Sequence, residues 1–169
     1  MRLDIYFAET ANIAREQTAM LDEARQALSA GRPLSRLERN GVLHAFQVLV
    51  ENAIGMAKHL LKDRGEPLPT ASALASVSGG PLPVSGYDSF SALCRSGILQ
   101  PSDLESWNRF IGLRNRIVHD YMNLDMERVL DLVRSEGYHF GNFSIIPGKK
   151  GGFSEVGYFR HSREGGNPA

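Results

Sequence analysis

The sequence is poor in features that mark several large classes of protein. It has a single cysteine, Cys94, so no disulfide framework can form within the chain, and a reducing compartment fits this usage. Its nineteen basic and nineteen acidic residues cancel, which argues against a generally basic coat for nucleic acid. No apolar run approaches the roughly 20 residues that span a bilayer, and the N-terminus lacks the apolar stretch of a signal peptide. We therefore expect a cytoplasmic protein without membrane contact, in which any RNA is bound by a local patch.

Apolar residues recur at helical spacing through most of the chain, whose 169 residues fit one domain. Ser35 and Glu38 form one expected capping box, and Ser102 and Glu105 form a second. The spacing and caps predict an all-α bundle of about five helices. These helices are expected at about 3–30, 35–64, 88–96, 102–121 and 125–136, with Asp88 and Asp125 as further N-caps.

Two stretches depart from this pattern. Residues 65–86 hold four prolines and a run of alanine and serine, which predicts a loop or insertion. Residues 137–169 are rich in glycine and basic residues, which predicts an irregular tail. The bundle itself is therefore expected to span residues 1–136. An alternative for the tail is a basic arm that binds RNA.

The segment from Arg114 to Tyr121 concentrates groups that can hold a phosphodiester and move a proton. Arg114 offers a planar fork of donors that matches phosphate oxygens. Free histidine titrates near neutrality, so His119 is suited to exchange a proton with a ribose 2′-hydroxyl or a leaving 5′-oxygen. Because RNA carries its own nucleophile, these two groups suffice for cleavage without a metal or cofactor.

Helical geometry restricts how these two groups can cooperate. Residues five apart lie roughly 140° apart around an ideal helix, so Arg114 and His119 do not share a face. Either the helix is irregular here, or two copies of the chain complete one another's site. A structural alternative is that these side chains cap the last helical turn and pair with Asp120.

Other polar residues are harder to assign. Arg109, Arg114 and Arg116 cluster in sequence beside Trp107 and Asn108, which suggests a local basic patch, or else a solvated helix face. Trp107 can stack on a base, but its place in the apolar spacing favours the core.

Three side chains of the second helix also bear on the site. Glu51 could orient an arginine of a partner, although a solvated or surface-paired carboxylate is favoured. His44 and His59 have no metal-ligand partner and receive no role. Cys94 is interpreted as a small buried core thiol.

The pattern Arg114-x4-His119-x-Tyr121 resembles the signature of the HEPN ribonucleases, and specifically of the HepT-type toxins. The likeness extends over residues 34–62 and 87–133. Membership would imply an antiparallel helical bundle that forms a homodimer with a composite, metal-independent ribonuclease site. It would also imply a neighbouring nucleotidyltransferase of the MntA type as antitoxin.

The resemblance also implies roles for individual residues. Arg114 and His119 would be catalytic, and Tyr121 would be the hydroxyl to which the antitoxin transfers AMP. Asn115 and Arg116 are supporting candidates for orienting RNA. Two other interpretations stay open: a non-catalytic subunit that binds a nucleotidyltransferase, and a decayed toxin disabled by its altered tail.

Overall fold

The computed structural model describes residues 3–65 and 85–141, and all regular elements in these ranges are helical. The predicted all-α bundle of about five helices is confirmed. Residues 66–84 of the expected loop and residues 142–169 of the expected tail lie outside the described part. The elements are α1 (Leu3–Ser29), α2 (Arg36–Asp63), α4 (Gly86–Arg95), α5 (Pro101–His119) and α6 (Met126–Arg134), with the short 3₁₀ helices η1 (Tyr121–Asn123) and η2 (Gly137–Gly141).

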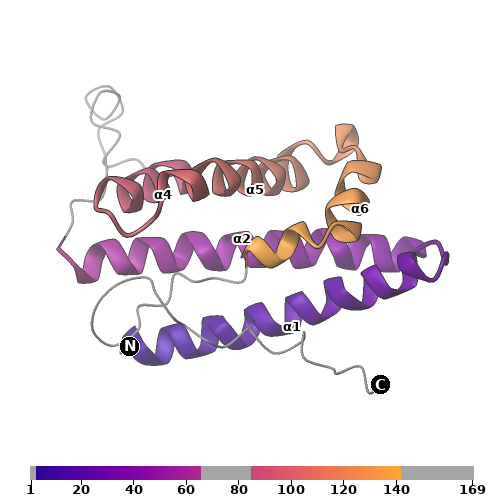
Figure 1. Ribbon diagram of the computed structural model, residues 1–169, viewed down its shortest axis with the longest axis horizontal. Coiled ribbons are helices and arrows are strands. Elements are labelled where there is room, and N and C mark those ends of the chain that lie inside the picture. Colours follow the sequence, from indigo (N-terminus) through magenta and orange to yellow (C-terminus); the bar gives the residue numbers. More distant parts are fainter. Residues whose placement is uncertain (1–2, 66–84, 142–169) are drawn as a thin grey trace, which may run out of the picture.

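Helix α2 is the central element, with α1 packed along one side and α4 and α5 along the other (Figure 1). α1 and α2 run antiparallel, because Gly41 near the start of α2 faces Met20 while Gly55 near its end faces Tyr6. α6 and η2 close the bundle against α1. None of the described helices combines the length and the apolarity needed to cross a bilayer.

The capping box predicted for α2 is confirmed. The Glu38 amide donates to Ser35 Oγ at 3.1 Å, and the Ser35 amide donates to the Glu38 carboxylate at 2.7 Å. Each of these two residues thus accepts, through its side chain, a hydrogen bond from the backbone amide of the other. Neither amide has a partner within the helix. Arg32 adds an ion pair to the same carboxylate at 2.7 Å. As predicted, Asp125 caps α6.

Two other predicted helix starts were wrong. α5 begins at Pro101 with Gln100 as its N-cap, and no capping box forms between Ser102 and Glu105. Proline is favoured at the first helical position, since its missing N–H has no intrahelical partner to lose. α4 is capped by Ser85, whose hydroxyl accepts a hydrogen bond from the amide of Asp88, the residue expected to be the cap.

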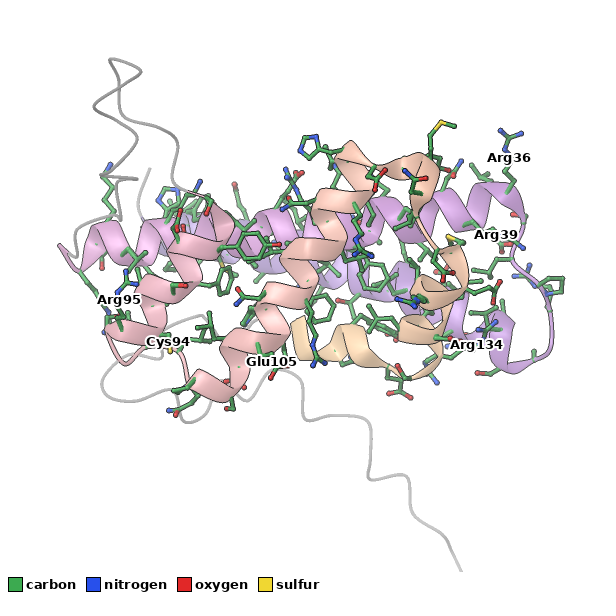
Figure 2. All side chains as sticks on the ribbon, turned by 90° about the horizontal axis from the view of Figure 1, so that it is seen from above. Arg36, Arg39, Cys94, Arg95, Glu105 and Arg134 are labelled. Carbon is green, nitrogen blue, oxygen red and sulfur yellow. The ribbon has the colours of Figure 1, made fainter. Side chains whose placement is uncertain are left out.

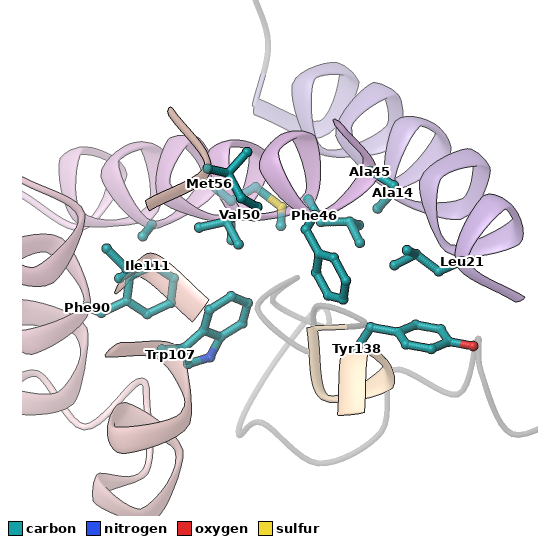
Figure 3. Close-up of a cluster of buried hydrophobic side chains, with 14 of the residues drawn as sticks. Ala14, Leu21, Ala45, Phe46, Val50, Met56, Phe90, Trp107, Ile111 and Tyr138 are labelled. Carbon is teal, nitrogen blue, oxygen red and sulfur yellow. The ribbon is translucent and has the colours of Figure 1, made fainter. Parts of the chain in front are cut away.

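Aromatic side chains fill the core between α2, α4 and α5 (Figure 3). Trp107 is 3 % exposed and stacks on Phe90 with ring centroids 4.6 Å apart, so its predicted core role is confirmed. The apolar spacing that places Trp107 in the core also predicts a buried Val118, but Val118 lies in the last turn of α5 and is 40 % exposed. Cys94 is half-buried against the core rather than fully enclosed.

The bundle continues beyond residue 136, where the sequence pattern placed its end. Tyr138 in η2 is 1 % exposed, and its hydroxyl donates to Asp22 Oδ1 of α1 at 2.5 Å. Burial and that carboxylate raise the pKa of Tyr138, which keeps the hydroxyl protonated as a donor. Glu136 and His139 also pair with α1, through Arg25 at 3.2 Å and Asp22 at 3.2 Å.

We expect Tyr138→Ala to lower the free energy of unfolding by about 3–5 kcal/mol, since it removes a large buried ring as well as a hydrogen bond. Tyr138→Phe keeps the ring and should cost about 1–3 kcal/mol. Urea unfolding followed by circular dichroism measures both. A loss below about 1 kcal/mol for Tyr138→Ala would show that η2 contributes little to the core.

Acid should weaken the start of α2. Hydrogen bonds from Arg32 and Ser35 lower the pKa of Glu38 to about 2 from its ordinary value of 4.5. Its stabilising contribution is therefore complete above the unfolded-state pKa and is lost as the pH falls through 4.5 towards 2. Melting temperatures of the wild type and Glu38→Gln should converge across that interval. A constant difference between them over the whole acidic range would contradict this origin.

Candidate functional site

The candidate site lies where the second half of α5 crosses the first half of α2. The two helices run antiparallel, because Arg114 contacts Glu51 while Tyr121 contacts Asn40. The described α5 is a continuous α-helix from Pro101 to His119. The irregular helix considered from the sequence is therefore excluded, and Arg114 and His119 lie roughly 140° apart around the axis.

Arg114 points across the bundle towards α2 and is held there. Its Nη2 and Nε donate to Glu51 Oε1 at 2.9 and 3.3 Å, and its Nη1 donates to Asn115 Oδ1 at 3.1 Å. The Arg114 side chain is 25 % exposed and that of Glu51 is 41 % exposed. The guanidinium is thus oriented by two partners while water and solutes still reach it.

His119 is the last residue of α5 and its side chain is exposed. Within residues 3–65 and 85–141 its imidazole has no hydrogen-bond or ion-pair partner, so both ring nitrogens face solvent. A basic residue in the last turn interacts favourably with the helix dipole. The imidazole is accessible and available for proton exchange with a bound molecule.

Tyr121 follows α5 directly, as the first residue of η1. The side chain is 57 % exposed, and its hydroxyl donates to Asn40 Oδ1 of α2 at 3.3 Å. The hydroxyl is therefore both accessible and oriented by the neighbouring helix. Met122 beside it is 93 % exposed, and Leu37 on α2 is 81 % exposed. Apolar side chains are thus exposed in the same two elements that carry this hydroxyl and its partner Asn40.

The purely structural alternative for this segment finds no support in the contacts. The Asp120 carboxylate accepts a hydrogen bond from Asn123 Nδ2 at 2.6 Å, and its amide donates to the Arg116 carbonyl at 2.9 Å. Among the residues that the structure describes, neither Arg114, His119 nor Tyr121 pairs with Asp120. The last turn of α5 is thus closed by its own backbone and by Asn123.

The three arginines that cluster in the sequence do not form one patch. Arg109 pairs with Glu105 on the solvent side of α5 at 2.5 Å and is 77 % exposed. Arg116 lies two turns further along the same side and is exposed, whereas Arg114 faces α2. A second group of basic residues occurs at one end of the bundle, where Figure 2 shows Arg36, Arg39 and Arg134.

A polar row on α2 faces this site, and only two of its members, His44 and Glu51, were considered from the sequence. Asn40, His44, Gln47 and Glu51 are spaced four, three and four residues apart, so they lie on one face of the helix. Gln47 Nε2 donates to Glu51 Oε1 at 3.1 Å. The spacing was visible in the sequence, but which helix would pack against this row was not.

The described residues hold no group of three or more His, Cys, Asp or Glu side chains that could hold a metal ion. The site presents one oriented guanidinium, one accessible imidazole and one accessible phenol. These groups can bind an anion, exchange a proton and accept a transferred group.

Comparisons with known proteins identify the family and support the fold. Residues 14–144 match the family model described as ribonuclease HepT-like. A comparison with curated proteins gave no match. Among solved structures, the chain resembles one described as "Crystal structure of the toxin-antitoxin with AMP-PNP", with 19 % identity and a TM-score of 0.51. The likeness covers 76 % of this chain and 92 % of that one, and it supports the fold.

Proposed function

The chain belongs to the HepT-like ribonuclease family, and from this membership we propose that it is an endoribonuclease acting as the toxin of a toxin–antitoxin pair. The observation that carries the proposal is the arrangement at the end of α5. There an oriented, reachable guanidinium and an accessible imidazole lie five residues apart on one helix.

Cleavage would use the ribose 2′-hydroxyl as nucleophile. His119 takes the proton of that hydroxyl as the 2′-oxygen bonds to phosphorus, and the bond from phosphorus to the 5′-oxygen breaks. The departing oxygen takes a proton from water, which gives a 5′-hydroxyl and a 2′,3′-cyclic phosphate. Arg114 binds the non-bridging oxygens and offsets the charge that develops on them. Asn115 holds Arg114, and the exposed Arg116 contacts the neighbouring phosphate backbone.

The site would be shared between two copies of the chain. Arg114 and His119 diverge by roughly 140° on a regular helix, so one phosphate cannot bridge both within a single copy. A symmetric pair with its α5 helices facing each other brings Arg114 of one copy to His119 of the other, twice. The divergence of these two side chains supports a homodimer.

The antitoxin would be a nucleotidyltransferase that uses Tyr121 as its acceptor. The Tyr121 hydroxyl is accessible and oriented by Asn40, as a nucleophile for group transfer must be. Its oxygen would attack the α-phosphorus of ATP, lose its proton and release pyrophosphate, which leaves AMP on the phenol. An adenylyl group two residues from His119 would block access of RNA to the site. The similar solved structure is of a toxin–antitoxin with AMP-PNP, a nucleotide, which agrees with this chemistry.

We expect purified wild-type protein to cut end-labelled RNA in excess EDTA and to leave 2′,3′-cyclic phosphate ends. His119→Ala should slow cleavage by about 10²- to 10⁴-fold, since it removes the proton-transfer group. A fully 2′-deoxy substrate should stay intact. If the folded, unmodified wild type does not cut, the non-catalytic partner subunit of a nucleotidyltransferase becomes the better interpretation, and cutting of the deoxy strand would refute the 2′-hydroxyl attack.

The shared site predicts complementation. Arg114→Ala and His119→Ala should each cut RNA far more slowly than the wild type when alone, but an equimolar mixture allowed to exchange subunits should recover about a quarter of wild-type activity. Half of the dimers would then be mixed, and one of their two sites would be intact. As a control, the chain carrying both substitutions should restore nothing when mixed with either single variant. No recovery despite proven exchange would place each site within one chain.

A further inference from the structure

We propose that Glu51 is a positioning residue for Arg114, which fixes the direction in which the guanidinium presents its free donors to phosphate. The proposal rests on the proposed function, because it takes Arg114 as the phosphate ligand. It goes beyond the motif, since Glu51 lies on α2, 63 residues from its partner in the sequence.

The contacts involve all three nitrogens of the guanidinium but leave two of its N–H donors available. An arginine side chain carries five N–H donors. Nε and Nη2 each give one to Glu51 Oε1, and Nη1 gives one to Asn115 Oδ1. One N–H of Nη1 and one of Nη2 remain without a partner among the described residues. These two donors remain for phosphate oxygens, so binding of phosphate does not require displacing Glu51.

The carboxylate is itself held in place. Gln47, one turn earlier on α2, donates to the same Oε1 atom at 3.1 Å. α2 is the most enclosed helix of the bundle, so Gln47 and Glu51 start from a backbone that packing keeps rigid. The orientation of Arg114 is thereby fixed by a contact to α2 as well as by its own helix.

The pair differs from an ordinary surface ion pair in this chain. Glu105 and Arg109 are four residues apart on α5, with side chains 74 % and 77 % exposed, and such pairs contribute little. Glu51 and Arg114 join two helices and are 41 % and 25 % exposed. Glu105 therefore supplies a control of the same chemistry that has no positioning role.

Charge gives this role a kinetic signature. The Glu51 carboxylate repels a phosphate that approaches Arg114, so Glu51 weakens ground-state binding while it improves orientation. Its removal should leave RNA binding equal or tighter but should slow the chemical step, because misplacement by about 1 Å can cost roughly 100-fold. A residue that merely stabilised the fold would lower the fraction of active protein without this division between KM and kcat.

The test compares single-turnover RNA cleavage by Glu51→Ala, Glu51→Gln and Glu105→Ala with that by the wild type, each checked by a melting curve. We expect Glu51→Ala to lower the rate about 10- to 100-fold with no weakening of RNA affinity. Glu51→Gln retains an oxygen acceptor and should fall between Glu51→Ala and the wild type. Glu105→Ala should match the wild type.

Two further measurements show whether Glu51 acts through Arg114. If it does, Glu51→Ala should cost nothing more when Arg114→Ala is already present, whereas independent roles multiply. The Nε–H resonance of Arg114, assigned in ¹⁵N NMR by its loss in Arg114→Ala, should shift in Glu51→Ala and not in Glu105→Ala. An unchanged resonance, an unchanged cleavage rate or multiplicative losses would each overturn the proposal. A wild type that fails to cut RNA would refute the ribonuclease function, while the resonance would still decide whether Glu51 holds Arg114.

Discussion

Burial of α2 is the constraint on which the rest of the structure depends. Packing against α1, α4, α5 and η2 covers most of the circumference of this helix and leaves a narrow polar strip. On that strip, Glu51 contacts Arg114 of α5, Asn40 contacts Tyr121 of η1, and Gln47 contacts Glu51. Packing of the core thus limits polar contacts between helices to this strip of α2. The motif residues at the end of α5 contact α2 along the strip. A site in this bundle is a consequence of how its most buried helix is packed.

Local signals in the sequence predicted much of the fold. The capping box at Ser35, the cap at Asp125 and the stop at Gly97, whose φ of +74° only glycine adopts readily, all correspond to features of the structure. The failures have a common cause. Ser102 and Asp88 are residue types that often cap helices, but α5 begins at Pro101 and the N-cap of α4 is Ser85. Hydrophobic periodicity alone does not choose between such neighbouring helix starts.

The site was visible from the sequence only in part. Arg114, His119 and Tyr121 stand out by their chemistry and spacing within one short segment. Their partners Asn40 and Glu51 lie 81 and 63 residues away, and helical periodicity places a residue on a face without naming the element that the face meets. For the same reason Arg109 and Arg116 looked like neighbours of Arg114, although they lie on the solvent side of α5. The packed position of Tyr138 was hidden likewise, because its partner Asp22 is 116 residues distant.

That last contact joins the first helix to the final described turn, and it has a consequence for the order of synthesis. The packing of α1 is complete only when Tyr138 contacts Asp22 and Glu136 contacts Arg25. Chains emerge from the ribosome N-terminus first, so α1 and α2 can pair long before this closure is available. A nascent chain that already carries Arg114 and His119 is still an open bundle. Emergence of the later segment around Tyr138, rather than of the motif, closes the bundle.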